Sequence, residues 1–287
     1  MDVAVALALI AGVAWAVNIV IVRWALDRTD GPPLAGAFVG VAVAAVVTTV
    51  VAVVAGGSGP TGENIWQFAL TGAIAPGASQ GLFVSSIESI GPARSSVLVS
   101  TNPVWSVALA IFFLDEGWRV PVLLGTALVV VGGVLISWEP GLGFRHIGVV
   151  LALIVAVTFG VRDVVASQFT NNTDLSVWWA ASIVLTSASL VVAAIGLVRH
   201  RQAFGAAVIG ATPSFVWSGV AIAIALTTLF GAFDRSRVGV VAPLSNAAQS
   251  VAVVVLGAAV FGAKERTPRI LAALVLVIAG GALITAT

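Results

Sequence analysis

The sequence predicts an all-α integral membrane protein whose ten transmembrane helices form two inverted repeats of five. Three observations predict this fold class: a scarcity of charge, ten apolar segments long enough to cross a bilayer, and a likeness between the two halves of the chain. Of the 287 residues, 60% are hydrophobic and only 9% are charged, whereas a soluble domain carries roughly 25% charged residues. The 13 basic and 12 acidic residues are too few to form the polar surface of a soluble protein of this length. We therefore expect a multi-pass protein of the cell membrane, in contact with the lipid bilayer.

The composition also excludes several kinds of partner and chemistry. The net charge is +1 and no run of like charges occurs, so no basic face is available to bind nucleic acid. The chain contains no cysteine, which excludes disulfides, thiolate metal sites and a cysteine nucleophile. The N-terminal apolar stretch lacks a basic region before it and runs directly into Asn18 and Arg23, so it is interpreted as the first membrane helix rather than a signal peptide.

Ten apolar segments are separated by short clusters of charged and turn-forming residues. A membrane span needs roughly 20 mostly apolar residues to cross about 30 Å of hydrocarbon. The connecting loops leave no room for a soluble domain. The expected spans are about 3–22, 32–55, 66–87, 93–114, 119–138, 146–168, 175–198, 214–232, 238–261 and 268–286.

The two halves of the chain resemble each other, which indicates a duplication. Residues 93–137 match residues 239–285 at an offset of about 146 to 149. A similar offset of about 144 places Asn18 opposite Arg162. We therefore expect one repeat in residues 1–140 and a second in residues 147–287. Because each repeat has an odd number of helices, the second enters the membrane in the opposite orientation, and such repeats usually enclose a binding site.

Each half ends in a recurring pattern around an acidic residue. In the first half, Pro103 is followed after twelve residues by Glu116, and Gly125 and Gly132 follow in the next span. With the two five-helix repeats, this pattern resembles the EamA-like branch of the drug/metabolite transporter superfamily over essentially the whole chain. The second half departs from the pattern, with Gln249 or a neighbour where proline is usual.

The resemblance implies a secondary transporter, and specifically an exporter, working by alternating access. Its substrate would be a small molecule such as an amino acid, another metabolite or a drug, and a proton or another ion would be coupled to transport. No cofactor is implied, and we expect a monomer. An intramembrane enzyme, a channel and a non-transporting assembly protein are the alternatives. No catalytic or metal-binding set is apparent, because the sequence lacks a nucleophile elbow and a phosphate-binding loop, and His146 and His200 stand apart.

Polar side chains inside the spans are the candidates for a substrate site, because lipid-facing amides and charges are costly. The fourth and ninth predicted spans occupy equivalent places in the two repeats, so their polar stripes would face each other. They would do so across a central cavity lined from predicted spans 1, 3, 4, 6, 8 and 9. The alternative is that these side chains form interhelical hydrogen bonds worth about 1 kcal/mol each. The predicted substrate-binding residues are Asn18, Gln80, Asn102, Trp105, Arg162, Asn246 and Gln249.

Arg162 and Asp163 form a charged pair within the sixth predicted span. Adjacent residues on a helix point about 100° apart, so each is expected to need another partner. For Arg162 this partner would be Glu88 or an anionic group of the substrate. Asp163 and Glu88 are the candidates for carrying a coupled proton. The alternative is that the helix ends early and the pair lies at the membrane surface.

Two prolines and two glutamates have structural interpretations as well. Pro76 and Pro103 lie within predicted spans, where each would mark a kink, a hinge or a free carbonyl group. Glu116 and Glu265 lie in loops, where helix capping or a loop ion pair is favoured over a role in transport.

The distribution of basic residues bears on membrane orientation, since cytoplasmic loops are enriched in Lys and Arg. The loops after the odd-numbered helices carry more basic residues than the opposite loops, which favours both termini outside. The resemblance implies both termini inside. The first set comprises Arg23, Arg28, Arg94, Arg145, Arg199, Arg201, Lys264, Arg266 and Arg269, and the second comprises Arg119, Arg235 and Arg237.

Overall fold

The computed structural model describes residues 2–90, 98–99, 101–137, 146–261 and 268–285. These residues are almost entirely helical, and no strand occurs among them. Six of the described helices are long and apolar enough to cross a membrane, which confirms the predicted all-helical membrane fold. They are α1 (Val3–Leu26), α2 (Pro33–Ala55), α8 (His146–Asn171), α9 (Val177–His200), α10 (Gln202–Phe233) and α11 (Val238–Phe261).

The remaining helices are shorter. The third crossing is composed of α3 (Gly62–Gly72), the π-helical segment η1 (Ala73–Ala78) and α4 (Ser79–Ile90). Counting these three as one, the described helices make the ten passes that were predicted. The others are α6 (Asn102–Phe113), α7 (Val120–Ser137) and α12 (Pro268–Thr285).

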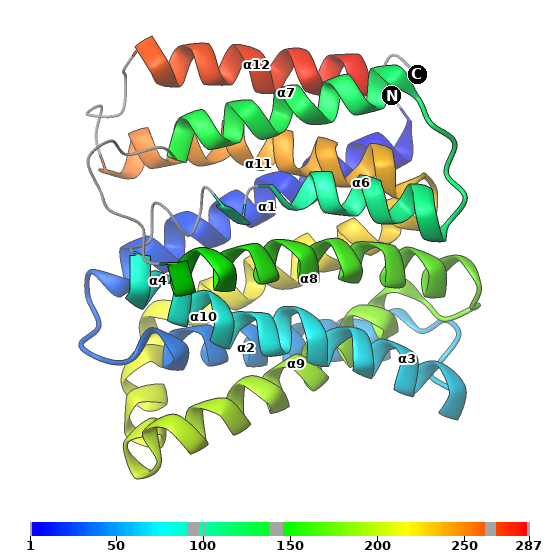
Figure 1. The fold of residues 1–287 in the computed structure, drawn as a ribbon. Coiled ribbons are helices and arrows are strands. Elements are labelled where there is room, and N and C mark those ends of the chain that lie inside the picture. The colour runs from blue at the N-terminus through cyan, green and yellow to red at the C-terminus, as the bar shows by residue number, and fades with distance from the viewer. Residues whose placement is uncertain (1, 91–97, 100, 138–145, 262–267, 286–287) are drawn as a thin grey trace.

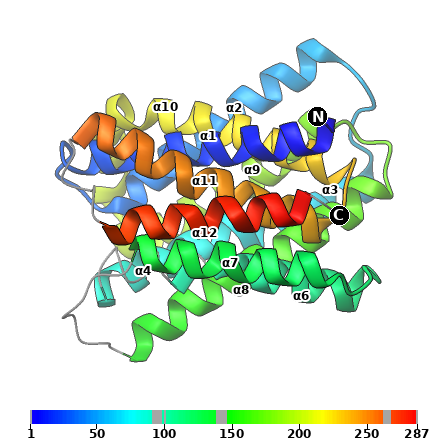
Figure 2. The same ribbon diagram turned by 90° about the horizontal axis from the view of Figure 1, so that it is seen from above.

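The helices lie side by side in one bundle (Figure 1). Helix α1 packs against α10 and α11, while α8 packs against α4 and α6. Helix α2 packs against α9 and α10, and α7 packs against α12 at one side of the bundle. Helices α1 and α8 run in opposite directions, and α1 begins at the end of the bundle where α12 finishes (Figures 1 and 2). A core of buried alanine, valine, leucine and phenylalanine side chains joins the helices of both halves.

Helices α7 and α12 approach each other closely at two glycines of α7. A Cβ atom on Gly125 would lie 2.7 Å from the backbone oxygen of Gly280, and one on Gly132 would lie 2.7 Å from that of Ala273. Small residues of this kind let membrane helices pack backbone to backbone. Gly125 and Gly132 therefore allow α7 to pack closely against α12.

The prediction for the eighth span was wrong at its start. Helix α10 begins at Gln202 and contains Pro213, whereas a start near residue 214 was expected. The chain reverses between α9 and α10 at Arg201, whose φ is 48°. Phe204 then packs into the space left by Gly196 of α9 and is 4% exposed. This packing stabilises the first turns of α10 although they contain glycine and precede a proline.

The two predicted proline sites differ from each other. In the third crossing the helix is interrupted at Ala75, whose φ of −147° and ψ of 121° are extended, directly before Pro76. The hydroxyl group of Ser79 donates to the carbonyl oxygen of Pro76 at 3.2 Å. Pro103, in contrast, lies in the first turn of α6 rather than in a helix interior, so the interior kink predicted there was wrong. Proline is tolerated in a first turn because the backbone N–H that it lacks has no partner within the helix there.

Candidate functional site

Arg162 and Asp163 lie inside the bundle, not at its surface. Helix α8 continues past them to Asn171. Arg162 is 7% exposed and Asp163 is 2% exposed. Burial of charged groups is costly unless they are paired and hydrogen-bonded. The early end of the helix that was part of the alternative for this pair is therefore wrong.

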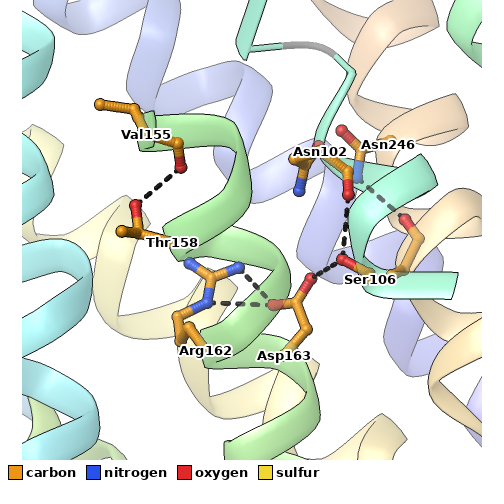
Figure 3. Close-up of polar contacts among 8 residues, drawn as sticks. Asn102, Ser106, Val155, Thr158, Arg162, Asp163 and Asn246 are labelled. Atoms are coloured by element: carbon orange, nitrogen blue, oxygen red, sulfur yellow. Dashed lines mark hydrogen bonds and ion pairs between the residues drawn. The ribbon is translucent and has the colours of Figure 1, made fainter. Parts of the chain in front are cut away.

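The two side chains bond directly to each other (Figure 3). Nε and Nη2 of Arg162 donate to Oδ1 of Asp163, at 3.0 Å and 2.6 Å. The expectation that adjacent residues would not meet was wrong, because the long arginine side chain folds back over the turn. Asp163 has a further partner, as expected: the hydroxyl group of Ser106 on α6 donates to Oδ2 at 2.8 Å. The carboxylate thus accepts three hydrogen bonds from two helices.

The rest of the Arg162 guanidinium group does not bond to Asp163. Its carbon Cζ lies 5.0 Å from the ring centroid of Phe159, one turn earlier on α8, which places the cation over an aromatic ring. Nη1 has no hydrogen-bond partner among the described residues, and Figure 3 shows it on the side of the group that faces away from Asp163. The spacing of three residues could have identified Phe159 as a neighbour of Arg162.

A close contact between α6 and α8 places Ser106 beside Asp163. A Cβ atom on Gly160 would lie 2.8 Å from Cβ of Trp105 and 2.9 Å from the backbone nitrogen of Ser106. Any other residue at position 160 would separate the two helices and lengthen the Ser106–Asp163 hydrogen bond. Trp105 lies against this glycine and is 38% exposed.

Three of the predicted amide side chains have no hydrogen-bond partner among the residues that the structure describes. They belong to Asn102, Gln80 and Gln249; Asn102 is buried at the start of α6, and the other two are half-buried. Nδ2 of Asn246 donates to the carbonyl oxygen of Ala242 on its own helix, at 2.9 Å. Figure 3 draws Asn102 and Asn246, which project from the packed helices α6 and α11.

Asn18 lies in a different contact. Its Oδ1 accepts a hydrogen bond of 2.6 Å from Ser218, which joins α1 to α10. Ser218 was not among the predicted residues, and no motif or spacing marked it. No hydrogen bond between the described residues connects Asn18 to the Arg162–Asp163 pair.

Glu88 and the central cavity are not defined by the described residues. Glu88 belongs to α4, which packs against α8, but its side chain lies outside the described part. Within that part, the partner of Arg162 is Asp163. One surface pocket is lined by Glu116, Arg119 and Arg237, and another by residues near Pro33. Neither contains a predicted substrate residue, so the central cavity stays a prediction.

Glu116 caps a helix of the other half of the chain. Its Oε1 accepts from the backbone N–H of Val238 at 2.7 Å, and Oε2 accepts from that of Gly239 at 3.0 Å. These are free N–H groups at the start of α11, where a negative charge is favourable. The capping interpretation of Glu116 is confirmed, whereas Glu265 lies outside the described residues.

Comparisons with known proteins agree with this fold. The model of the EamA-like transporter family matches residues 2–138. A solved crystal structure is similar over 99% of this chain and 96% of its own, with a TM-score of 0.79 and 19% sequence identity. At that identity the likeness concerns the fold alone, and it extends over both halves. No curated protein matches the chain.

Proposed function

We propose that this chain, whose residues 2–138 match the model of the EamA-like transporter family, is a secondary carrier that exports a small metabolite or drug across the cell membrane by alternating access. The observation that carries the proposal is the Arg162–Asp163–Ser106 cluster, a charged site buried between α6 and α8. Charged residues are rare in membrane-spanning segments, and they commonly mark substrate or ion pathways.

The carrier is proposed to consist of two inverted repeats, residues 1–140 and 147–287. In this arrangement α8 is the equivalent of α1, and the third crossing is the equivalent of α10. The helix pairing supports it, because α1 packs against α10 and α8 likewise packs against the third crossing. The close contacts of α7 and α12 support it too. At one and the same offset, Gly125 corresponds to Ala273 and Gly132 corresponds to Gly280. The contact of Gly125 with Gly280 is therefore the repeat equivalent of the contact of Gly132 with Ala273. Rocking of one repeat against the other would then expose the site to each side in turn.

Within this carrier, Arg162 and Asn102 are proposed to bind the substrate, and Asp163 or Glu88 to carry a coupled proton. The remaining predicted residues are proposed to line the path that opens when the repeats move. These are Asn18, Gln80, Trp105, Asn246 and Gln249.

Reconstitution into liposomes tests the proposal. We expect uptake of a radiolabelled solute from a panel of amino acids, organic acids and cationic drugs to saturate and to be accelerated by the unlabelled solute on the other side. This counterflow distinguishes a carrier from a channel. Arg162→Gln should reduce the rate at least tenfold. Arg235→Gln is the matched control, because Arg235 also pairs with the preceding aspartate, Asp234, but at an exposed site with side chains 47% and 38% exposed. Flux that does not saturate, or equal loss in both variants, would contradict the proposal.

A further inference from the structure

The hydrogen bonds of the buried pair restrict what it can bind, and this inference rests on the proposed function. We propose that Arg162 binds the carboxylate of a substrate that has no ammonium group beside it, and that one proton enters the site with the substrate and is held by Asp163. The substrate class is therefore that of small organic acids.

The free hydrogen-bond donors of Arg162 lie on the side of the guanidinium group away from Asp163. Nε and Nη2 of Arg162 are both occupied by Oδ1 of Asp163. Nη1 retains its donors, faces away from Asp163 and lies over the side of α8 that carries Thr158 (Figure 3). Carboxylates are the common partners of guanidinium groups. A carboxylate bound at Nη1 would thus lie on the opposite side of the guanidinium group from Asp163.

This position disfavours a zwitterion. The ammonium group of an α-amino acid lies next to its carboxylate, so it would also lie on the side away from Asp163. Oδ1 of Asp163 already accepts two hydrogen bonds, and Oδ2 accepts that of Ser106. An ammonium group at Nη1 would have no carboxylate within reach and would stand beside the arginine cation. A carboxylate without an ammonium neighbour avoids this repulsion.

The charge of a bound carboxylate must also be balanced inside the bundle. The described pair is neutral, and a bound carboxylate alone would leave a net negative charge inside the bundle, which is costly in a membrane. The helices packed against α8 are α3, η1, α4, α6, α10 and α11. Their described side chains provide no cation at the pair; Glu63 lies at the start of α3, and the Glu88 side chain of α4 lies outside the described part. One proton taken up with the acid restores neutrality.

Ser106 is placed to accommodate this proton. Its Oγ lies 2.8 Å from Oδ2 of Asp163 and 3.2 Å from the backbone oxygen of Asn102. A hydroxyl group has one hydrogen to donate and can accept in turn. When Asp163 is ionised, Ser106 donates to Oδ2. When Oδ2 is protonated, Oδ2 donates to Ser106, and Ser106 donates to Asn102. Both protonation states are therefore hydrogen-bonded without movement of the helices.

The balance is simple: one carboxylate and one proton enter together, no covalent bond of the substrate changes, and the same two species leave. The net charge of the site is zero both with and without substrate. Transport of the acid is therefore expected to be electroneutral, driven by a pH gradient and unaffected by a potassium diffusion potential.

Binding to the purified full-length protein in detergent tests the inference. The probes are matched in shape: 4-methylpentanoate, its amide and leucine, together with lactate, pyruvate and the straight-chain acids from propionate to hexanoate. We expect at least one acid to raise the melting temperature, because a ligand of the native state stabilises it. Its amide and its amino acid should bind at least tenfold more weakly. In weak buffer with a pH indicator, one proton should be taken up for each acid bound.

Variants separate the two roles. Arg162→Gln should weaken acid binding at least tenfold, whereas Asp163→Asn should bind the acid without proton uptake. Arg235→Gln and Asp234→Asn, which change the exposed pair, should behave as the unaltered protein does. If Asp163→Asn does not fold, proton uptake by the unaltered protein and by Asp163→Glu still decides whether a carboxylate at this position takes up the proton.

Each result has a definite consequence. Equal or tighter binding of the amide or leucine, or the absence of binding by every acid, overturns the substrate class. Acid binding without proton uptake by the unaltered protein overturns the role of Asp163. Acid binding with proton uptake but without counterflow in liposomes would leave this site intact and overturn the proposed carrier function. Counterflow of solutes that lack a carboxylate would support a carrier and refute this site.

Discussion

Glu116 connects the loop between α6 and α7 to the first residues of α11. Its two carboxylate oxygens accept hydrogen bonds from two backbone N–H groups that have no partner within the helix. Such charge-assisted hydrogen bonds are worth about 1.5–3 kcal/mol when broken. A single side chain of the first half thereby stabilises a helix of the second half.

We expect Glu116→Ala to lower the free energy of unfolding by about 1–3 kcal/mol, because both N–H groups of α11 lose their acceptor. Thermal unfolding in detergent measures the change. Gly239→Ala should be destabilising as well, since its Cβ would lie 2.8 Å from Oε2 of Glu116. In the double variant of Glu116→Ala and Gly239→Ala, the loss of stability caused by Gly239→Ala should largely disappear, because Oε2 of Glu116 is no longer present.

Glu63→Ala provides the control for this prediction. Glu63 lies in the first turn of α3 and is exposed. Removing its charge should cost only about 0.3–1 kcal/mol through the helix dipole. A loss as large as that of Glu116→Ala would show that charge near a helix start, not the hydrogen bonds, accounts for the effect.

At the scale of single residues, the sequence predicted which side chains are unusual better than it predicted their partners. Arg162 and Asp163 were identified because charges are costly within a span. Their direct bond could not be predicted from the directions of the two helix positions, because it depends on the length and the rotamer of the arginine side chain. Ser106 and Ser218 form decisive contacts, but serine is common in membrane helices, and only the three-dimensional packing selects these two.

At the scale of helices, backbone contact between α7 and α12 is the clearest constraint. Gly125→Ala places a Cβ atom 2.7 Å from the backbone oxygen of Gly280, which cannot move as a side chain could. Overpacking of this kind costs about 1–3 kcal/mol. We expect a corresponding decrease in the free energy of unfolding, measured in the same detergent assay.

Gly210→Ala is the matched control for this helix contact. Gly210 also lies within a helix, but nothing lies within 4 Å of the position its Cβ would take. Alanine there should be neutral or stabilising by about 0.5–1 kcal/mol, because glycine is the poorer helix former. If both substitutions have the same sign and size, the close contact of α7 and α12 does not control stability.

The helix boundaries show where sequence patterns lose their value. Apolar length predicted most crossings, because only a helix satisfies its backbone in lipid. The start of α10 was missed because its glycines and Pro213 resemble a loop, whereas the packing of Phe204 against Gly196 keeps the segment helical. The interruption at Ala75 could be suspected from Pro76, but its extended backbone could not.

The two ends of the bundle differ in their number of basic residues, and this difference predicts the membrane orientation. The loop between α1 and α2 and the turn between α9 and α10 lie on the side that carries most of the basic residues. Since this side is expected to face the cytoplasm, both termini should lie outside. The family resemblance implies the reverse.

The absence of native cysteine makes a direct measurement simple. Gly59→Cys lies between α2 and α3, on the side of the termini, and no atom lies within 4 Å of its Cβ position. Asp30→Cys lies in the exposed loop between α1 and α2. We expect an impermeant maleimide to label Gly59→Cys in intact cells and Asp30→Cys only after lysis. The reverse pattern would establish termini inside.

The contact of α7 with α12 also concerns the kinetics of the proposed cycle. Helix α7 belongs to the first proposed repeat and α12 to the second, so rocking of the repeats turns these two helices against each other. Because backbone oxygens of α12 lie close to Gly125 and Gly132 of α7, we expect this contact to persist as the pivot of the motion. A flexible covalent cross-link at this contact would then leave the turnover rate unchanged, because the two helices stay together throughout the cycle.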